Sequence, residues 1–174
     1  MASFIENPVK YSINKTLFIR LTGILLGLRK HNWSKVPLVI METEGASSFH
    51  QATLAKEVVK LDSIKSVATS LGSLSIQKEL LEMSMSGEFN VISGVVTDRS
   101  AIQACLQFAN DHRMLVEPAC GAGLSSIYSD SFITSESPLK AIKSDNKKPI
   151  VLIVCGGEIV SMELLQKWKD QFSL

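Results

Sequence analysis

Hydrophobic positions recur along the chain with two spacings, and these predict helices and strands in alternation. Apolar residues continue through successive helical turns over residues 17–29, and Lys30 and Asn32 then suit a helix C-terminus. Residues 36–41 form a β-branched run without polar alternation. Such a run predicts a strand that is buried on both faces, as in a parallel sheet.

The segment after this first strand begins with polar residues and continues with apolar residues at helical intervals. Residues 42–50 are small and polar, and they follow the carboxyl end of the strand. Residues 51–60 repeat apolar side chains at helical intervals, which places Leu54, Val58 and Val59 on the predicted inner face. We therefore expect a loop and then a helix that packs through these three side chains.

The middle of the chain contains one ambiguous segment, followed by further predicted elements. Residues 63–75 are rich in Ser and Thr, and they fit a strand edge, a loop or a short helix. Residues 77–84 predict a helix and residues 90–97 predict a strand. Asp98 then suits the N-cap of a helix over residues 101–111.

The C-terminal part continues this alternation. Residues 114–116 predict a short strand, and Pro118 opens a helix of small residues that ends at Tyr128. Residues 149–154 predict a buried strand, which leads through a Cys-Gly-Gly turn into a closing helix over residues 158–172. Strands followed by helices at this spacing predict an α/β fold with a mostly parallel sheet flanked by helices.

The composition fits one globular domain and excludes several classes of protein. The 174 residues include 45% hydrophobic and 20% charged side chains, a balance that excludes a disordered chain. Eighteen basic and 17 acidic residues give a net charge of +1, so no strong field attracts nucleic acid or an acidic membrane. The longest apolar run, residues 21–28, is too short to span a bilayer. We expect no nucleic-acid partner and no membrane partner.

The cysteines favour a cytoplasmic protein. There are three, and their number and wide spacing fit neither a zinc knuckle nor a CxxC redox pair. We expect reduced thiols, with Cys105 and Cys120 as small core residues. Residues 1–15 lack the apolar run of a secretory signal, which agrees with a cytoplasmic location.

Two segments occupy the position where open α/β sheets bind ligands, just outside the carboxyl ends of the strands. These are residues 42–50 and residues 155–158. The second is a Gly-Gly turn into a helix, where backbone can approach a planar ligand or an anion. A Gly-Gly turn is more often a plain connection, so its position alone does not establish a site.

Several single residues could carry chemistry, each with a structural alternative. His50 could transfer protons, but without a carboxylate beside it in the sequence a half-buried histidine bonded to backbone is the better interpretation. Glu42 and Glu44 would face the same side of an extended segment, where they could bind a hard cation or line a solvated loop. Glu117 precedes Pro118 and is best explained as an acidic residue at a helix N-terminus.

Four blocks of sequence resemble the L-serine/L-threonine dehydratases, which are fold-type II enzymes that use pyridoxal phosphate (PLP). The four blocks are Val36–His50, Ser66–Gly72, Leu115–Ala122 and Ile153–Gly157. They occur in the family's order and spacing, so residues 21–174 look like the C-terminal half of a eukaryotic catabolic member. The resemblance implies part of the large domain of that fold, which is like that of the tryptophan synthase β chain.

The resemblance implies a lyase that takes an amino acid as substrate and PLP as cofactor. In the family, serine yields pyruvate and ammonia, and threonine yields 2-oxobutyrate and ammonia. Cys155 would lie against the pyridine nitrogen with Gly156 beside it, and the segment that contains Ser70 would lie against the cofactor ring. The family also holds a monovalent cation through oxygens, which would come here from Glu42, Ala46, Ser48, Leu71 and Ser73.

Parts of the family's machinery have no counterpart in this sequence. Neither the SxKxRG-type segment of the PLP-binding lysine nor the SSGNAG segment that contacts the ring occurs. Residues 16–19, Thr-Leu-Phe-Ile, stand where the family has a glycine-rich phosphate loop. The resemblance thus implies a divergent segment 1–20, a partial large domain 21–174, and no catalytic residue. We expect a truncated chain that is inactive alone.

Two further interpretations stay open. The chain could be the C-terminal half of a split dehydratase that a separate N-terminal chain completes. It could also be a non-catalytic protein that binds an intact dehydratase, as a dimer partner does. In each case a sheet edge and apolar surface should be exposed, so we expect poor solubility or self-association.

Overall fold

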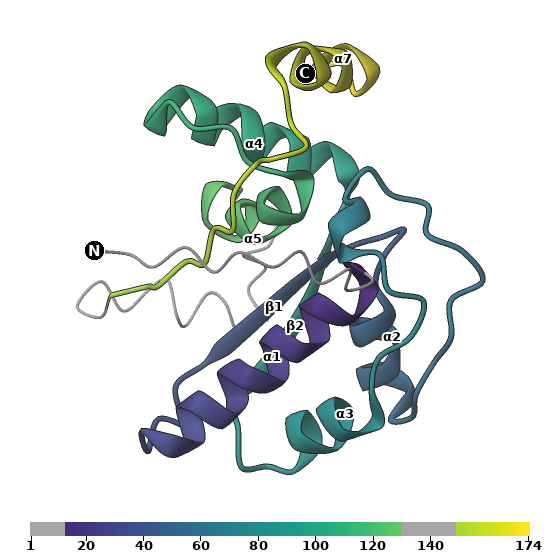
Figure 1. Cartoon of the computed structure of the whole chain (residues 1–174), viewed down its shortest axis with the longest axis vertical. Helices are drawn as coiled ribbons and strands as arrows, with labels where there is room; N and C mark the ends of the chain where they lie inside the picture. Colours follow the sequence, from purple (N-terminus) through teal and green to yellow (C-terminus); the bar gives the residue numbers. More distant parts are fainter. Residues whose placement is uncertain (1–12, 130–148) are drawn as a thin grey trace, which may run out of the picture.

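The computed structural model describes residues 13–129 and 149–174. Its elements, in chain order, are α1 (Ile13–Lys30), β1 (Leu38–Thr43), α2 (Ser48–Ala55), the 3-10 helix η1 (Thr69–Leu71), α3 (Lys78–Met85), β2 (Val91–Val96), α4 (Asp98–His112), α5 (Pro118–Tyr128) and α7 (Met162–Gln171). Helices α1, α2 and α3 pack on one face of the two strands, and α5 packs on the other face, with α4 and α7 beyond it (Figure 1). The predicted α/β class is confirmed.

The sheet consists of β1 and β2, which pair in parallel from Leu38 opposite Val91 to Thr43 opposite Val96. The crossover between them contains α2, η1 and α3. The last four residues of β1 are buried, as the apolar run predicted, and the strand extends to Thr43. This pairing places the loop after β1 and the start of α4 at the same end of the sheet.

Three buried clusters form the core. The first, with Leu25 and Phe49, fills the space between the sheet and helices α1, α2 and α3. The second, with Ile102 and Leu165, lies among α4, α5 and α7. The third joins the two groups of helices through Leu71 and Ala122, together with residues of β1 and β2. The 3-10 helix is therefore held between the sheet and α5.

The predicted inner face of the second helix is wrong. Leu54 is 71% exposed and Val58 is 42% exposed, whereas Phe49 and Ala52 are completely buried. The helix begins at Ser48, three residues before the periodicity suggested, and it ends before Val58 is reached. This earlier start gives the helix a different inner face.

The strand predicted over residues 149–154 is absent, although the run is apolar. Val151 is 85% exposed and Ile153 is 61% exposed, while Leu152 and Val154 pack on the second cluster. A strand needs a neighbour for its backbone hydrogen bonds, and within the described ranges β1 and β2 pair only with each other. The strand predicted at 114–116 is likewise absent, and the closing helix starts only at Met162.

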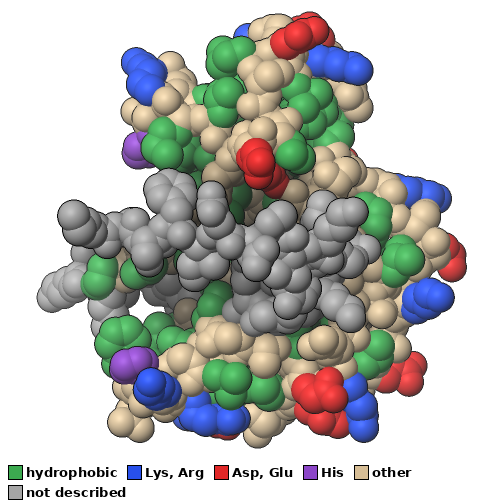
Figure 2. Space-filling view, viewed as in Figure 1, with side chains coloured by type: hydrophobic (Ala, Val, Ile, Leu, Met, Phe, Trp, Pro, Cys, Tyr) green, Lys and Arg blue, Asp and Glu red, His purple; other side chains and the backbone are tan. Residues whose placement is uncertain are grey.

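The described surface carries hydrophobic side chains on both groups of helices, with charged side chains around them (Figure 2). In the part of the chain that the structure describes, no helix is long and apolar enough to cross a bilayer. Most of the segment 1–20 that we expect to be divergent lies outside the described residues, apart from the first turns of α1. Self-association through the exposed apolar side chains stays a prediction.

Candidate functional site

Glu42 lies near the end of β1 and is only 1% exposed. One carboxylate oxygen accepts a hydrogen bond from the backbone N–H of Phe49 at 3.1 Å, and the other accepts one from His50 N–H at 2.7 Å. These two N–H groups belong to the first turn of α2, which has no hydrogen-bond acceptors of its own for them. Glu42 therefore fixes the start of α2 to the end of the sheet. Glu44 is exposed, so the expectation that both carboxylates face one side is wrong.

Burial raises the pKa of Glu42 to about 7, and its two backbone hydrogen bonds oppose the shift. A glutamic acid in an unfolded chain has a pKa of about 4.3. Because the folded pKa is the higher one, the fold binds the proton more tightly than the unfolded chain does. This contribution to stability is complete below about pH 4 and is lost as the pH rises through the folded pKa.

We expect the free energy of unfolding to fall by about 3 kcal/mol over this range, mostly between about pH 5 and about pH 8. Urea denaturation across that range, in buffers without alkali cations, measures the loss. Glu42→Gln carries no ionisable group and should remove this part of the pH dependence. Subtracting the two curves also cancels the contribution of His50, whose pKa burial lowers. Identical slopes for the two proteins would show that Glu42 does not ionise in a buried site.

All five residues predicted to hold a monovalent cation are buried. They are Glu42, Ala46, Ser48, Leu71 and Ser73. Ala46 and Leu71 belong to the same buried cluster, and the Ser73 hydroxyl donates to the carbonyl of Ser75 at 2.7 Å. The Ser48 hydroxyl is buried and has no hydrogen-bond partner. A buried polar atom of this kind indicates a water or ion that would complete its bonding.

The predicted set contains one carboxylate, and its other ligands are hydroxyl and carbonyl oxygens. This donor set suits a weakly charged, hard cation rather than a transition metal. Within residues 13–129 and 149–174, no group of three or more His, Cys, Asp or Glu side chains could hold a metal ion. The monovalent cation stays a prediction from the resemblance.

A chain of hydroxyl and carboxylate groups connects the end of β1 to the start of α4. The Ser66 hydroxyl donates to one oxygen of Asp98 at 2.6 Å and lies 2.7 Å from the hydroxyl of Thr43. Because the single Ser66 proton goes to Asp98, Thr43 is the donor in the second bond. Asp98 also accepts from the Val67 N–H at 3.0 Å, and Ser66 accepts from the Ala68 N–H at 2.9 Å. These bonds position the segment that leads into η1.

This arrangement corrects the prediction that Asp98 is the N-cap of α4. The N-cap is Thr97, whose hydroxyl accepts from the Ser100 N–H at 3.1 Å. The Asp98 carboxylate turns instead toward residues 66 and 67. A threonine directly before the aspartate is a common N-cap, so this assignment could have been made from the sequence.

The three residues predicted to contact a cofactor converge on the N-terminus of α5. The Ser70 hydroxyl in η1 donates to the carboxylate of Glu117. The Glu117 backbone N–H donates to the carbonyl of Gly156 at 3.0 Å, and the Cys155 N–H donates to the sulfur of Cys120 at 3.4 Å. Segments that lie far apart in the sequence therefore meet around Glu117, and their role toward a cofactor stays a prediction.

Glu117 has a different role from the one predicted for it. It is the N-cap residue of α5, but its side chain makes no capping hydrogen bond and accepts from Ser70 instead. Its interaction with Ser70 joins η1 to α5, and its backbone holds the turn at Gly156. Sequence reasoning missed this role because residues 70, 117 and 156 carry no shared local pattern.

The Gly-Gly turn needs its glycines for two different reasons. A Cβ on Gly157 would lie 2.3 Å from the carbonyl oxygen of Leu115, so the turn packs closely against the chain that enters α5. Gly156 has a φ of +133°, which side chains rarely permit, and a Cβ there would have no atom within 4 Å. The turn is therefore fixed on one side and open on the other.

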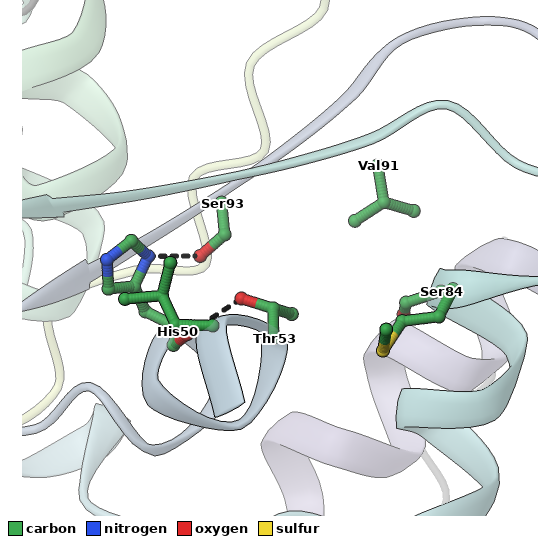
Figure 3. Close-up of a pocket in the computed structure, with 7 residues that line it drawn as sticks. His50, Thr53, Ser84, Val91 and Ser93 are labelled. Carbon is green, nitrogen blue, oxygen red and sulfur yellow. Dashed lines mark hydrogen bonds between the residues drawn. The ribbon is translucent and has the colours of Figure 1, made fainter. Parts of the chain in front are cut away.

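His50 lies at a second place, between α2, α3 and β2. Its ring nitrogen Nδ1 is 3.0 Å from the hydroxyl of Ser93, and Thr53 donates to the His50 carbonyl at 2.7 Å (Figure 3). The expected backbone bond to the ring is thus replaced by a hydroxyl. The open pocket here has a volume of about 260 Å³ and is lined by His50, Thr53, Leu54, Ser84, Met85, Val91 and Ser93. Burial lowers the pKa of His50, which favours the neutral ring.

Comparison with known proteins identifies a family model that matches residues 19–156 and describes a "Pyridoxal-phosphate dependent enzyme". The chain is 43% identical over 153 residues to "Serine dehydratase-like" of Rattus norvegicus, which covers 88% of this chain and 45% of the relative. It is 37% identical over 154 residues to "L-serine dehydratase/L-threonine deaminase" of Homo sapiens, which covers 88% of this chain and 46% of the relative.

The fold comparison agrees with these matches. The crystal structure of a fungal L-serine ammonia-lyase from Rhizomucor miehei superposes with a TM-score of 0.75 and 32% sequence identity. The alignment covers 87% of this chain and 46% of the fungal chain. The chain therefore spans less than half the length of the relatives that it matches.

Proposed function

The chain belongs to the pyridoxal-phosphate dependent enzymes, and from this premise we propose that it forms the cofactor-ring side of an L-serine/L-threonine dehydratase. The reaction is the removal of ammonia from L-serine, which gives pyruvate, or from L-threonine, which gives 2-oxobutyrate. The names of the relatives support this substrate class. The observation that carries the proposal is the meeting of Ser70, Cys155 and Gly156 at the N-terminus of α5, where Ser70 and Gly156 contact Glu117 and Cys155 contacts Cys120.

The residues around this point fit the ring of PLP. Gly156 leaves open space where other residues have a side chain, and the Cys155 side chain is exposed beside it. A planar ring needs such an open face next to backbone. When bound, PLP acts as an electron sink that makes loss of the α-proton and the β-hydroxyl feasible.

The chain's own residues would bind and orient the ring. The Cys155 thiol is a weak, neutral hydrogen-bonding group, so it would leave the pyridine nitrogen without a proton. Glu117 fixes the Ser70 hydroxyl, and through it the part of η1 that would lie along the ring. The buried Ser48 hydroxyl and the Glu42 carboxylate fit a monovalent cation that would support the same end of the sheet.

The proposed activity needs groups that this sequence lacks. The PLP-binding lysine segment and the glycine-rich phosphate loop of the family do not occur in it. We assign both to residues outside this sequence that correspond to the part of the relatives beyond the matched 45%. The apolar run at residues 150–153, in which Ile150, Val151 and Ile153 are exposed, lies outside the described sheet and would pair with a strand of that part.

The test is to reconstitute activity from two parts. We expect this chain, coexpressed with the unmatched half of the rat serine dehydratase-like relative, to form a complex that converts L-serine to pyruvate in the presence of PLP. Either part alone should be slower by roughly 10³-fold or more, because neither holds both the lysine and the ring contacts. The matched control replaces the PLP-binding lysine of the complementary half with alanine and should also abolish turnover.

The complex and its activity are scored separately. Size-exclusion chromatography with light scattering reports assembly, and a coupled pyruvate assay reports turnover. A one-to-one complex that binds PLP and forms no product from serine or threonine would refute the proposal. Full turnover by the present chain alone would refute the assignment of the lysine to residues outside this sequence.

A further inference from the structure

We propose that Cys120 and Cys155 form a redox-sensitive thiol pair, which a hydroperoxide oxidises to an intramolecular disulfide. The Cys155 backbone N–H donates to the Cys120 sulfur at 3.4 Å, and the Cys120 thiol donates to the Gly156 carbonyl at 3.7 Å. The Cys120 sulfur thus lies against the backbone of residues 155 and 156, although 35 positions separate the two cysteines in the sequence.

The geometry requires little movement of the chain. The Cβ atom of Cys155 is bonded to the Cα atom next to the amide nitrogen that already touches the Cys120 sulfur. Rotation about the Cα–Cβ bond of Cys155 therefore moves its sulfur on a circle whose centre lies only a few ångströms from the Cys120 sulfur. A disulfide needs Cα atoms within roughly 4.4–6.8 Å, a range that such a backbone–sulfur contact favours.

The two thiols differ in their exposure to solvent. The reaction requires this difference, because one thiol meets the oxidant and the other only meets its partner. The Cys155 side chain is exposed, so a small oxidant can reach it, whereas Cys120 is only 9% exposed. Cys105 is completely buried next to Cys120, and burial raises the pKa of its thiol to about 12. Because thiolates are the reactive form, Cys105 should remain unreacted under conditions that oxidise the pair.

The reaction balances with a hydroperoxide as the oxidant. The Cys155 thiolate attacks one peroxide oxygen, which forms a sulfenic acid and, after protonation, one molecule of water or alcohol. The Cys120 thiolate then attacks the Cys155 sulfur, and the hydroxide that leaves takes a proton to form a second water. Two thiols have lost two protons and two electrons, and the peroxide has been reduced.

The disulfide would connect the first turn of α5 with the segment that leads into α7. It would also remove the Cys155 thiol from the place where we expect the pyridine nitrogen, a consequence that rests on the proposed function. In the reducing cytoplasm that we propose for this protein, the pair would be reduced at rest and oxidised only transiently. Oxidation of this thiol pair by a hydroperoxide would therefore change how the chain binds the cofactor.

The experiment oxidises the full chain with hydrogen peroxide, without PLP and without a complementary half. After alkylation of the remaining thiols, peptide mapping by mass spectrometry should show a Cys120–Cys155 disulfide and an alkylated Cys105. The melting temperature should rise by about 10 °C and return on reduction with dithiothreitol, because the bond closes a long loop. Cys120→Ser and Cys155→Ser should show no shift, whereas the matched control Cys105→Ala should still show it.

Mapping of the wild-type chain keeps the test valid if a variant does not fold. A Cys105–Cys120 bond, a dimer linked through Cys155, or a sulfinic acid at Cys155 with Cys120 still a thiol would each overturn the proposal. All of these readouts are independent of serine turnover. Failure of the disulfide can therefore be distinguished from failure of the proposed dehydratase function.

Discussion

Replacing Gly121 with alanine should destabilise the protein by about 3 kcal/mol. A Cβ on Gly121 would lie 2.2 Å from the backbone oxygen of Ala101 and 2.6 Å from the sulfur of Cys105. Backbone cannot yield as a flexible side chain does, so α4 and α5 would have to separate. The free energy of unfolding from urea denaturation measures the loss.

The same helix contains a matched control. A Cβ on Gly123 would meet only the Leu152 side chain, at 3.9 Å, which is an ordinary contact. Gly123→Ala should therefore leave stability unchanged or raise it by up to about 1 kcal/mol, because alanine favours the helix. Equal losses at the two positions would contradict the close approach of α4 and α5 at Gly121. The pair tests the packing that holds Glu117 in place.

Replacing Phe49 with alanine should cost about 4 kcal/mol, since its side chain is completely buried between α2 and the sheet. The backbone N–H that bonds to Glu42 is retained in the variant, so the loss reports packing alone. Leu54→Ala in the same helix should change stability by less than about 0.5 kcal/mol, because Leu54 is 71% exposed.

The comparison of Phe49 and Leu54 decides which face of α2 is the inner one. Thermal or urea unfolding of both variants beside the wild type is sufficient. A larger loss for Leu54→Ala than for Phe49→Ala would restore the face that helical periodicity predicted. The outcome also bears on the site, since the start of α2 supplies both N–H donors to Glu42.

The candidate site depends on long-range bonds between short segments. Ser70, Glu117 and Gly156 come from the 3-10 helix, the start of α5 and the turn before α7. Asp98 and Ser66 fix the approach to the same 3-10 helix from the end of the sheet. Gly121 matters to the site because its backbone N–H donates to the Glu117 carbonyl at 3.0 Å and because α4 packs closely against it.

Several elements could be predicted from the sequence because their signals are local. The apolar runs of β1 and β2 and the proline at the start of α5 are such signals, and the structure confirms these elements. The burial of Cys105 and Cys120 also followed from their residue type. The family blocks gave the PLP-dependent family, which the comparisons confirm.

Other features could not be predicted because they depend on neighbours elsewhere in the chain. The run at 149–154 has the composition of a buried strand, but burial and strand pairing require a partner strand that the described residues do not supply. The face of α2 depended on where the helix starts, and a short helix gives too few apolar positions to fix its rotation. Both predictions were wrong because they inferred burial, which depends on tertiary packing, from the local sequence alone.

The sequence by itself determined the class of fold, the positions of most helices and of the two paired strands, and the family. Only the tertiary structure decided that Glu42 is buried under α2, that Asp98 bonds to Ser66 instead of capping α4, and that Glu117 joins Ser70 to Gly156. The reason is physical. Periodicity and capping act within a few residues, whereas a buried carboxylate takes whichever donors the packed chain brings within hydrogen-bonding distance.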